Sequence, residues 1–123
     1  MSNGEPSIVF DKQAQIILNL AFTEAVKRKH GYVTPEHLLF ALSFDKRVTK
    51  IMRACGLDID RARKDMDEFF DGDLVPSSEQ KKPKPTMAFE RILQNSVNQA
   101  LSSGRDMATG SSLLASIFVK DRS

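Results

Sequence analysis

The sequence predicts an all-α protein made of two related helical units. Apolar residues recur at spacings of three and four in several stretches, which is the pattern of amphipathic helices, and no segment is expected to form a sheet. Between these stretches lie residues that start or end helices, chiefly Thr, Asp, Pro and Gly. A constant offset of 75 residues relates two parts of the chain, which is typical of a duplicated unit. The repeated positions are Ala14, Ile17, Leu18, Ala25 and Thr34 in the first copy, and Phe89, Ile92, Leu93, Ala100 and Thr109 in the second.

Composition indicates one globular domain without a membrane segment. The 123 residues are 41% apolar and 28% charged with a net charge of +2, so one core is expected and nucleic acid is not required as a partner. No apolar run approaches the roughly 20 residues of a bilayer span, and the polar start lacks the features of a signal peptide. Cys55 is the only cysteine, so no intrachain disulfide can form. We therefore expect a cytoplasmic protein.

The first unit begins with two predicted helices. The first runs from about 11 to 29, and Gly31 is placed to end it in a left-handed turn. Thr34 can cap a second helix that continues to about 43, because its hydroxyl can accept a hydrogen bond from a free backbone amide. Pro35 suits the first position of that helix.

Two further helices are expected in the first unit. The third runs from about 46 to 54 and ends near Gly56. Asp58 can cap the fourth, and Gly72 lies beyond its end. The expected buried face of the fourth helix is Ile59, Ala62, Met66, Phe69 and Phe70.

A polar linker over 73–86, interrupted by prolines, is predicted to separate the units. Thr86 can cap a fifth helix from about 87 to 103, and Thr109 can open a sixth. The 75-residue offset places the start of a further helix at the last residue, so the second unit is expected to stop after its second helix. Apolar surface is then expected to stay uncovered at Leu93, Val97, Leu113 and Ile117.

The expected organisation is a flexible N-terminus over 1–10, a first repeat over 11–72, the linker, and a partial second repeat over 87–123. Within it, His30, His37 and Cys55 could form a Cys-His pair or a metal site, yet no metal-ligand spacing supports this. His37 is instead expected to be a hydrogen-bonded polar residue between helices. The scattered glycines form no phosphate loop, and the acidic stretch over 58–73 is expected to be a solvated helix face.

Two motifs on either side of the linker carry a resemblance to a known family. They are TPEHLLFAL at 34–42 and PTMAFERIL at 85–93, followed by SGR at 103–105 and TG at 109–110. Together they resemble the amino-terminal domain of the Clp family of AAA+ unfoldases, of the ClpA type. The resemblance covers the chain from about Phe10 onward. It implies the Clp-N bundle, in which two pseudo-repeated four-helix units are joined by a polar linker.

The resemblance implies a non-catalytic binding domain. Clp-N domains accept adaptors and unfolded or tagged protein substrates for ATPase modules, which use ATP and Mg and act with ClpP. In the ClpA type the adaptor is ClpS. For this segment the resemblance implies no cofactor, no nucleic acid and no membrane. The residues to which it assigns adaptor binding, each of which also has a structural explanation as a helix-starting residue, are Thr34, Pro35, Glu36, Pro85 and Thr86.

Two other classes remain open at the level of sequence. The chain could be a free-standing Clp-N-like regulator that competes for adaptors, or a helical nucleic-acid binder whose affinity falls with salt. An enzyme is the least supported class. Phe44, near the end of the second helix, either extends an apolar groove for unfolded segments or belongs to the core.

Overall fold

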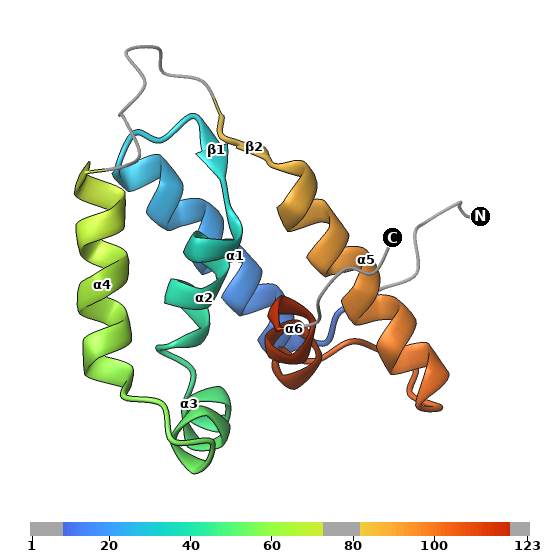
Figure 1. Ribbon diagram of the computed structural model, residues 1–123. Coiled ribbons are helices and arrows are strands. Elements are labelled where there is room, and N and C mark those ends of the chain that lie inside the picture. Colours follow the sequence, from blue (N-terminus) through green and yellow to red (C-terminus); the bar gives the residue numbers. More distant parts are fainter. Residues whose placement is uncertain (1–8, 73–81, 119–123) are drawn as a thin grey trace.

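The computed structural model describes residues 9–72 and 82–118, which form six α-helices and a minor two-stranded sheet (Figure 1). The predicted all-α fold class is thereby confirmed. Residues 1–8 of the expected flexible N-terminus, residues 73–81 of the linker and residues 119–123 lie outside the described residues. The elements are α1 (Lys12–Lys27), β1 (Tyr32–Val33), α2 (Pro35–Leu42), α3 (Lys46–Ala54), α4 (Ile59–Gly72), β2 (Lys84–Pro85), α5 (Met87–Ser102) and α6 (Gly110–Ile117).

Side-chain caps begin the helices where the sequence predicts them. Thr34 accepts from the His37 amide at the start of α2, and Thr86 accepts from the Phe89 amide at 3.1 Å at the start of α5. Thr109 caps α6 in the same way as Thr34 caps α2. These hydroxyls satisfy backbone N–H groups that have no partner within the first turn of the helix.

Lys29, and not Gly31, makes the left-handed turn that ends α1. Lys29 has a φ of 60°, and the next amide, of His30, donates to the Ala25 carbonyl at 2.9 Å. This is the six-to-one hydrogen bond of the Schellman motif. Gly104, the counterpart of Lys29, has a φ of 80° and ends α5 in the same way. The expectation for Gly31 is wrong because the left-handed residue is the one that directly follows the C-cap of the helix. The C-cap is Arg28, so that residue is Lys29.

Two parallel backbone pairings join the repeats, although the sequence predicts no sheet. Val33 of β1 lies opposite Pro85 of β2, and a single bridge pairs Phe10 with Ala108 in the same parallel sense. The 75-residue offset relates Val33 to Ala108 and Phe10 to Pro85, so the two pairings are one arrangement made twice. The expectation of no sheet is wrong at this point because strands of two residues are too short to show alternation.

The main core lies where α1, α2, α5 and α6 meet (Figure 1). Phe22 of α1 packs edge-on against Phe89 of α5, with ring centroids 5.7 Å apart. Leu38 and its counterpart Leu113 are both 0% exposed. The expectation that Leu113 keeps exposed surface is therefore wrong, because this residue faces the centre in the same way as Leu38. The other three residues expected to be uncovered are half-buried, namely Leu93, Val97 and Ile117.

The helix α4 covers one face of α2, whereas in the part of the chain that the structure describes the matching face of α6 borders an open groove. Met66 and Phe70 of α4 pack against Phe40 of α2 in a second apolar cluster. The offset maps Phe40 onto Ala115 of α6, which lines a groove of about 440 Å³ between α3 and α6. The other residues of this α3–α6 groove are Ile51, Met52, Cys55, Leu57, Ser111, Leu114 and Phe118.

Candidate partner-binding surface at the junction of the two repeats

The strand pairing brings the five predicted adaptor-binding residues to one place. Thr34 follows β1 and caps α2, whereas Thr86 follows β2 and caps α5. Because Val33 and Pro85 lie opposite each other, the two caps lie side by side. The Thr86 amide donates to the Val33 carbonyl at 3.1 Å. We call this region the cap junction, and its residues are Thr34, Pro35, Glu36, Pro85 and Thr86.

The threonine hydroxyls of the cap junction are already engaged in the fold. Thr34 is 9% exposed, and its hydroxyl caps α2. Thr86 is half-buried, and its hydroxyl caps α5. Glu36 is half-buried in the first turn of α2, where its carboxylate is favoured by the helix dipole. The threonines therefore position the junction, and Glu36 is its accessible charged side chain.

Two exposed apolar side chains flank the cap junction, and the sequence did not single them out. Tyr32, the first residue of β1, is 59% exposed, and Met87, the first residue of α5, is 76% exposed. Tyr32 faces outward because the next residue, Val33, is fully buried and alternate strand residues face opposite sides. The only sequence signal for them is their place beside the helix-starting threonines. Aromatic and Met side chains are enriched at protein interfaces.

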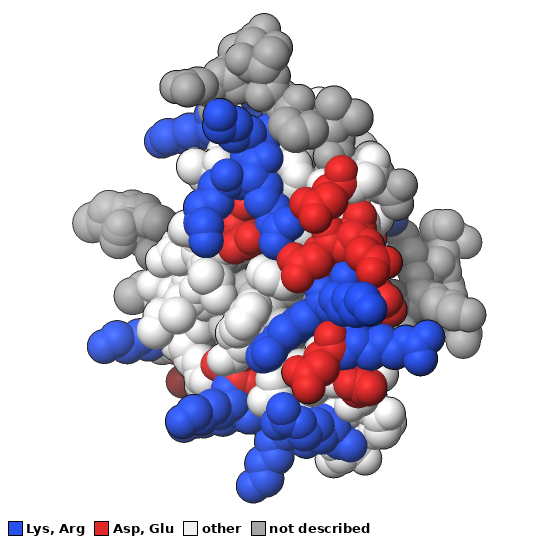
Figure 2. Space-filling model, turned by 90° about the vertical axis from the view of Figure 1, so that its left-hand side faces the viewer, with Lys and Arg blue, Asp and Glu red and all other residues white. Residues whose placement is uncertain are grey.

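Charges of both signs alternate on the face that carries α3 and α4 (Figure 2). Arg28, the residue that follows α1, reaches this face through ion pairs with Asp67 at 2.5 Å and Asp71 at 3.5 Å, and it also pairs with Glu24 at 2.6 Å. The acidic stretch thus forms a largely solvated helix face. This alternation differs from the single-sign stripe that is typical of a nucleic-acid-binding face.

Two buried histidines lie next to the cap junction. The amide of Thr34 donates to Nδ1 of His37 at 2.9 Å, so His37 is a hydrogen-bonded residue of the first turn of α2, as predicted. Nε2 of His37 lies 2.9 Å from Nδ1 of His30. Burial lowers the pKa of His37 to about 4, with further lowering by His30 and Arg28. The pKa of His30 is also lowered, chiefly by burial.

The third member of the hypothetical metal or Cys-His site lies elsewhere. Cys55 is exposed and lines the α3–α6 groove, whereas His30 and His37 lie between α1, α2 and α4. Among the described residues, no group of three or more His, Cys, Asp or Glu side chains could hold a metal ion. The three residues are therefore not brought together.

Phe44 lies at the surface and not in the core. Its side chain is 51% exposed and packs edge-on against Phe40, with ring centroids 5.1 Å apart. The guanidinium of Arg63 lies 4.2 Å from the centre of the Phe44 ring. This distance is within the range of a cation–π contact, which holds α4 to the end of α2.

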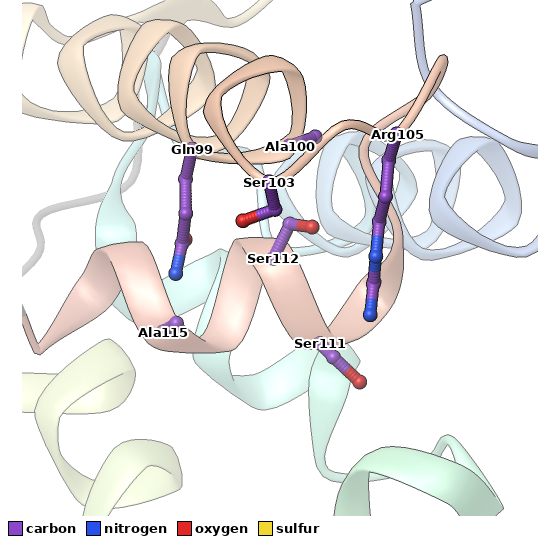
Figure 3. Close-up of a pocket in the computed structure, with 7 residues that line it drawn as sticks. All are labelled: Gln99, Ala100, Ser103, Arg105, Ser111, Ser112 and Ala115. Carbon is purple, nitrogen blue, oxygen red and sulfur yellow. The ribbon is translucent and has the colours of Figure 1, made fainter.

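A polar pocket of about 260 Å³ lies between α5 and α6 (Figure 3). Ser103 and Ser112 lie close together in it, and Arg105 extends along one side. The offset relates Ser112 to His37 and Arg105 to His30, so this pocket is the second-repeat version of the histidine crevice. No sequence motif marks the pocket directly, but the repeat offset locates it once the first-repeat crevice is known.

The fold defines a class of protein: a helical domain of two related repeats, in which the starts of α2 and α5 meet at the cap junction. The histidine and threonine side chains described above serve helix caps and helix packing. In the part of the chain that the structure describes, no helix has both the length and the apolar character needed to cross a membrane.

The chain belongs to the Clp repeat (R) N-terminal domain family, whose model matches residues 9–123. It is therefore a non-catalytic domain of the kind found at the N-terminus of Clp ATPases. The sequence motifs at 34–42 and 85–93 had indicated the same family.

Known relatives agree with this assignment. The ClpA homolog protein of Fuscovulum blasticum is 34% identical over 117 residues, which cover 93% of this chain and 15% of that relative. The Hsp104 N-terminal domain from Candida albicans has a TM-score of 0.80 at 12% identity, covering 88% of this chain and 72% of that one. The N-terminal domain of the ClpV1 ATPase from E. coli has a TM-score of 0.75 at 18% identity, covering 89% and 67%. At these identities the two structures show a shared fold.

Proposed function

We propose that this domain docks an adaptor of the ClpS type at the cap junction and thereby supplies protein substrates to a Clp ATPase. The observation that carries the proposal is the parallel strand pairing, which sets the starts of α2 and α5 side by side. The exposed side chains of Tyr32 and Met87 flank this junction. The 34% identity with a ClpA homolog supports an adaptor of the ClpA type.

The cap junction combines the features of a specific docking surface. Tyr32 and Met87 offer apolar area that a partner can remove from water, and the carboxylate of Glu36 offers a charged hydrogen-bond acceptor. The helix starts are held by caps and by a strand pairing, so little conformational entropy is lost when a partner binds.

The wider setting belongs to the same proposal. This chain spans 15% of the length of the ClpA homolog. We infer that ATP and Mg bind to ATPase modules outside this segment. We also infer that ClpP receives the unfolded chains and that the system is cytoplasmic. The domain itself then raises the local concentration of unfolded or tagged substrates near the ATPase, since tethering increases effective concentration without new contacts.

Isothermal titration calorimetry with a ClpS-type adaptor tests the docking site. Met87→Glu is expected to weaken binding by about tenfold or more, because it places a charge in a contact that excludes water. Leu101→Glu is the matched control, since Leu101 is 58% exposed and lies near the other end of α5. This control is expected to leave the affinity unchanged.

Reversal of the accessible charge provides a second variant. Glu36→Lys is expected to weaken adaptor binding while circular dichroism shows unchanged helicity. Wild-type affinity in both Met87→Glu and Glu36→Lys would show that the adaptor docks elsewhere. No binding by the wild-type domain would overturn the proposed function itself.

A further inference from the structure

The two histidines form a hydrogen-bonded relay that starts at the α2 cap and packs on Phe70 of α4. The chain contains two histidines in total, and both are buried. A hydrogen bond of 2.9 Å links Nε2 of His37 to Nδ1 of His30. The His37 ring stacks on Phe70 of α4, with centroids 4.6 Å apart. The His30 ring also packs against the Phe70 ring, with centroids 5.7 Å apart. The imidazoles therefore occupy the contact between the start of α2 and the end of α4.

The direction of each hydrogen bond in the relay follows from the first donor. The Thr34 amide can only donate, so Nδ1 of His37 is an acceptor and the neutral ring carries its proton on Nε2. That proton is donated to Nδ1 of His30, whose own proton is then on Nε2. The His30 ring packs against the Phe70 ring of α4, with centroids 5.7 Å apart.

An added proton on either ring conflicts with these hydrogen-bond directions. On His37 it would place an N–H at Nδ1 against the N–H of Thr34. On His30 it would place an N–H at Nδ1 against the N–H of His37. Two donors facing each other in a buried site cannot both be satisfied. Protonation of either ring therefore disfavours the closed contact between α2 and α4.

The charged groups around the relay come from α1 and α4. Arg28, at the C-cap of α1, opposes protonation of both rings, whereas Glu24 of α1 and Asp71 of α4 favour protonation of His30. Arg28 already pairs with Glu24, Asp67 and Asp71, which reduces the influence of these carboxylates on the imidazole. Burial reinforces the neutral form of both rings.

We propose that this relay is a proton-sensitive latch, in which proton uptake by either histidine releases the end of α4 from α2 and loosens the Thr34 cap. The latch is independent of any partner. Its effect on docking rests on the proposed function, because Thr34 belongs to the cap junction. Acidification would then weaken adaptor binding as well as the contact between α2 and α4.

The second repeat supplies an internal control for the latch. Ser112 takes the place of His37 there, and its Oγ accepts from the Thr109 amide at 3.1 Å. The cap of α6 is thus built like the cap of α2 but contains no titratable side chain. A proton-sensitive latch should affect the start of α2 and leave the start of α6 unchanged.

The expected pH window follows from the lowered pKa values. The ordinary pKa of histidine is 6.5, and that of latched His37 is about 4, so the open state binds more protons between these values. The stabilising contribution is complete above pH 6.5 and is lost as the pH falls toward 4. Each extra proton bound on opening raises the equilibrium constant for opening by up to about tenfold for every unit by which the pH falls.

Nuclear magnetic resonance on the full chain with ¹⁵N-labelled histidine tests the relay directly. Both rings are expected to carry their proton on Nε2 at neutral pH. On acidification, the amide signals of Thr34 and of the last turn of α4 should change together, while that of Thr109 should not. A proton on Nδ1 of His37 at neutral pH, or free titration of either ring near pH 6.5 with unchanged α4 signals, would overturn the proposal.

A double variant separates the latch from general acid destabilisation. His30→Gln with His37→Ser removes both titratable rings and gives α2 the type of cap that α6 has. Between pH 7 and 5, the unfolding equilibrium constant of the wild type in urea is expected to rise about tenfold more than that of the variant. Equal pH dependence would refute the latch, and the wild-type resonance experiment decides the question if the variant does not fold.

Adaptor titrations at both pH values distinguish the latch from the proposed function. Weaker binding at pH 5 in the wild type, but not in the double variant, supports both. Absence of adaptor binding at either pH overturns the docking proposal and leaves the resonance test of the latch unaffected.

Discussion

Lys29 holds a left-handed backbone conformation that its counterpart Gly104 adopts without steric cost. The φ angles are 60° and 80°, and each residue ends a helix with the same six-to-one hydrogen bond. A side chain at such a position crowds the neighbouring carbonyl, which costs roughly 1 kcal/mol. Duplication therefore conserves the turn, whereas the residue that makes the turn differs.

Lys29→Gly is expected to raise the free energy of unfolding by about 0.5–1 kcal/mol, since the relief of crowding exceeds the added entropy of the unfolded chain. Urea unfolding followed by circular dichroism measures the change. Gly104→Lys is the reciprocal variant and should lower the free energy of unfolding by a similar amount. A loss of stability in Lys29→Gly would contradict this account of the turn.

Among the elements, α4 depends on a small cluster for its place on α2. Phe70 is 1% exposed and contacts Phe40, His37 and His30, with ring centroids 4.6 to 5.7 Å apart. The Arg28 guanidinium lies 4.8 Å from the centre of the Phe70 ring, which connects α1 to the same cluster. One aromatic side chain thus joins three helices.

Phe70→Ala is expected to lower the free energy of unfolding by about 3–4 kcal/mol, because it removes a large buried side chain and leaves a cavity. Phe69→Ala is the matched control on the same helix, where the side chain is half-buried. The control should cost clearly less. Similar losses in the two variants, measured by urea unfolding, would show that α4 is not anchored through Phe70.

At the scale of the whole molecule, the two repeats differ in how the corresponding faces of α2 and α6 are covered. The helix α4 packs on α2, whereas the corresponding face of α6 lines the open α3–α6 groove among the described residues. Phe118 is 59% exposed at this groove. Contiguous apolar surface of this kind binds hydrophobic dyes and partners.

Phe118→Glu is expected to reduce the fluorescence of a dye that reports exposed apolar surface, because it adds a charge to the α3–α6 groove. Val26→Glu is the matched control, since Val26 is 58% exposed on α1 and does not line the groove. Equal fluorescence in Phe118→Glu and the wild type would mean that the groove is closed in solution.

Much of the fold could be predicted from the sequence, while the candidate site could be predicted only in part. The predicted caps at Thr34, Thr86 and Thr109 are confirmed, because a cap depends only on residues within one helical turn. The adaptor role of the five cap-junction residues stays a prediction. Tyr32 and Met87 were missed because their exposure depends on how the rest of the chain packs.

The sequence by itself determined the helices, their caps, the duplication and the family, because local spacing and short motifs specify these features. Only the tertiary structure decided that β1 pairs with β2, that His30 meets His37, and that Leu113 is buried while Phe118 is exposed. These outcomes depend on groups that come together only after the chain has folded. The physical reason is that tertiary hydrogen bonds and burial depend on residues that are close in space, whereas helix propensity and capping depend on residues that are close in the sequence.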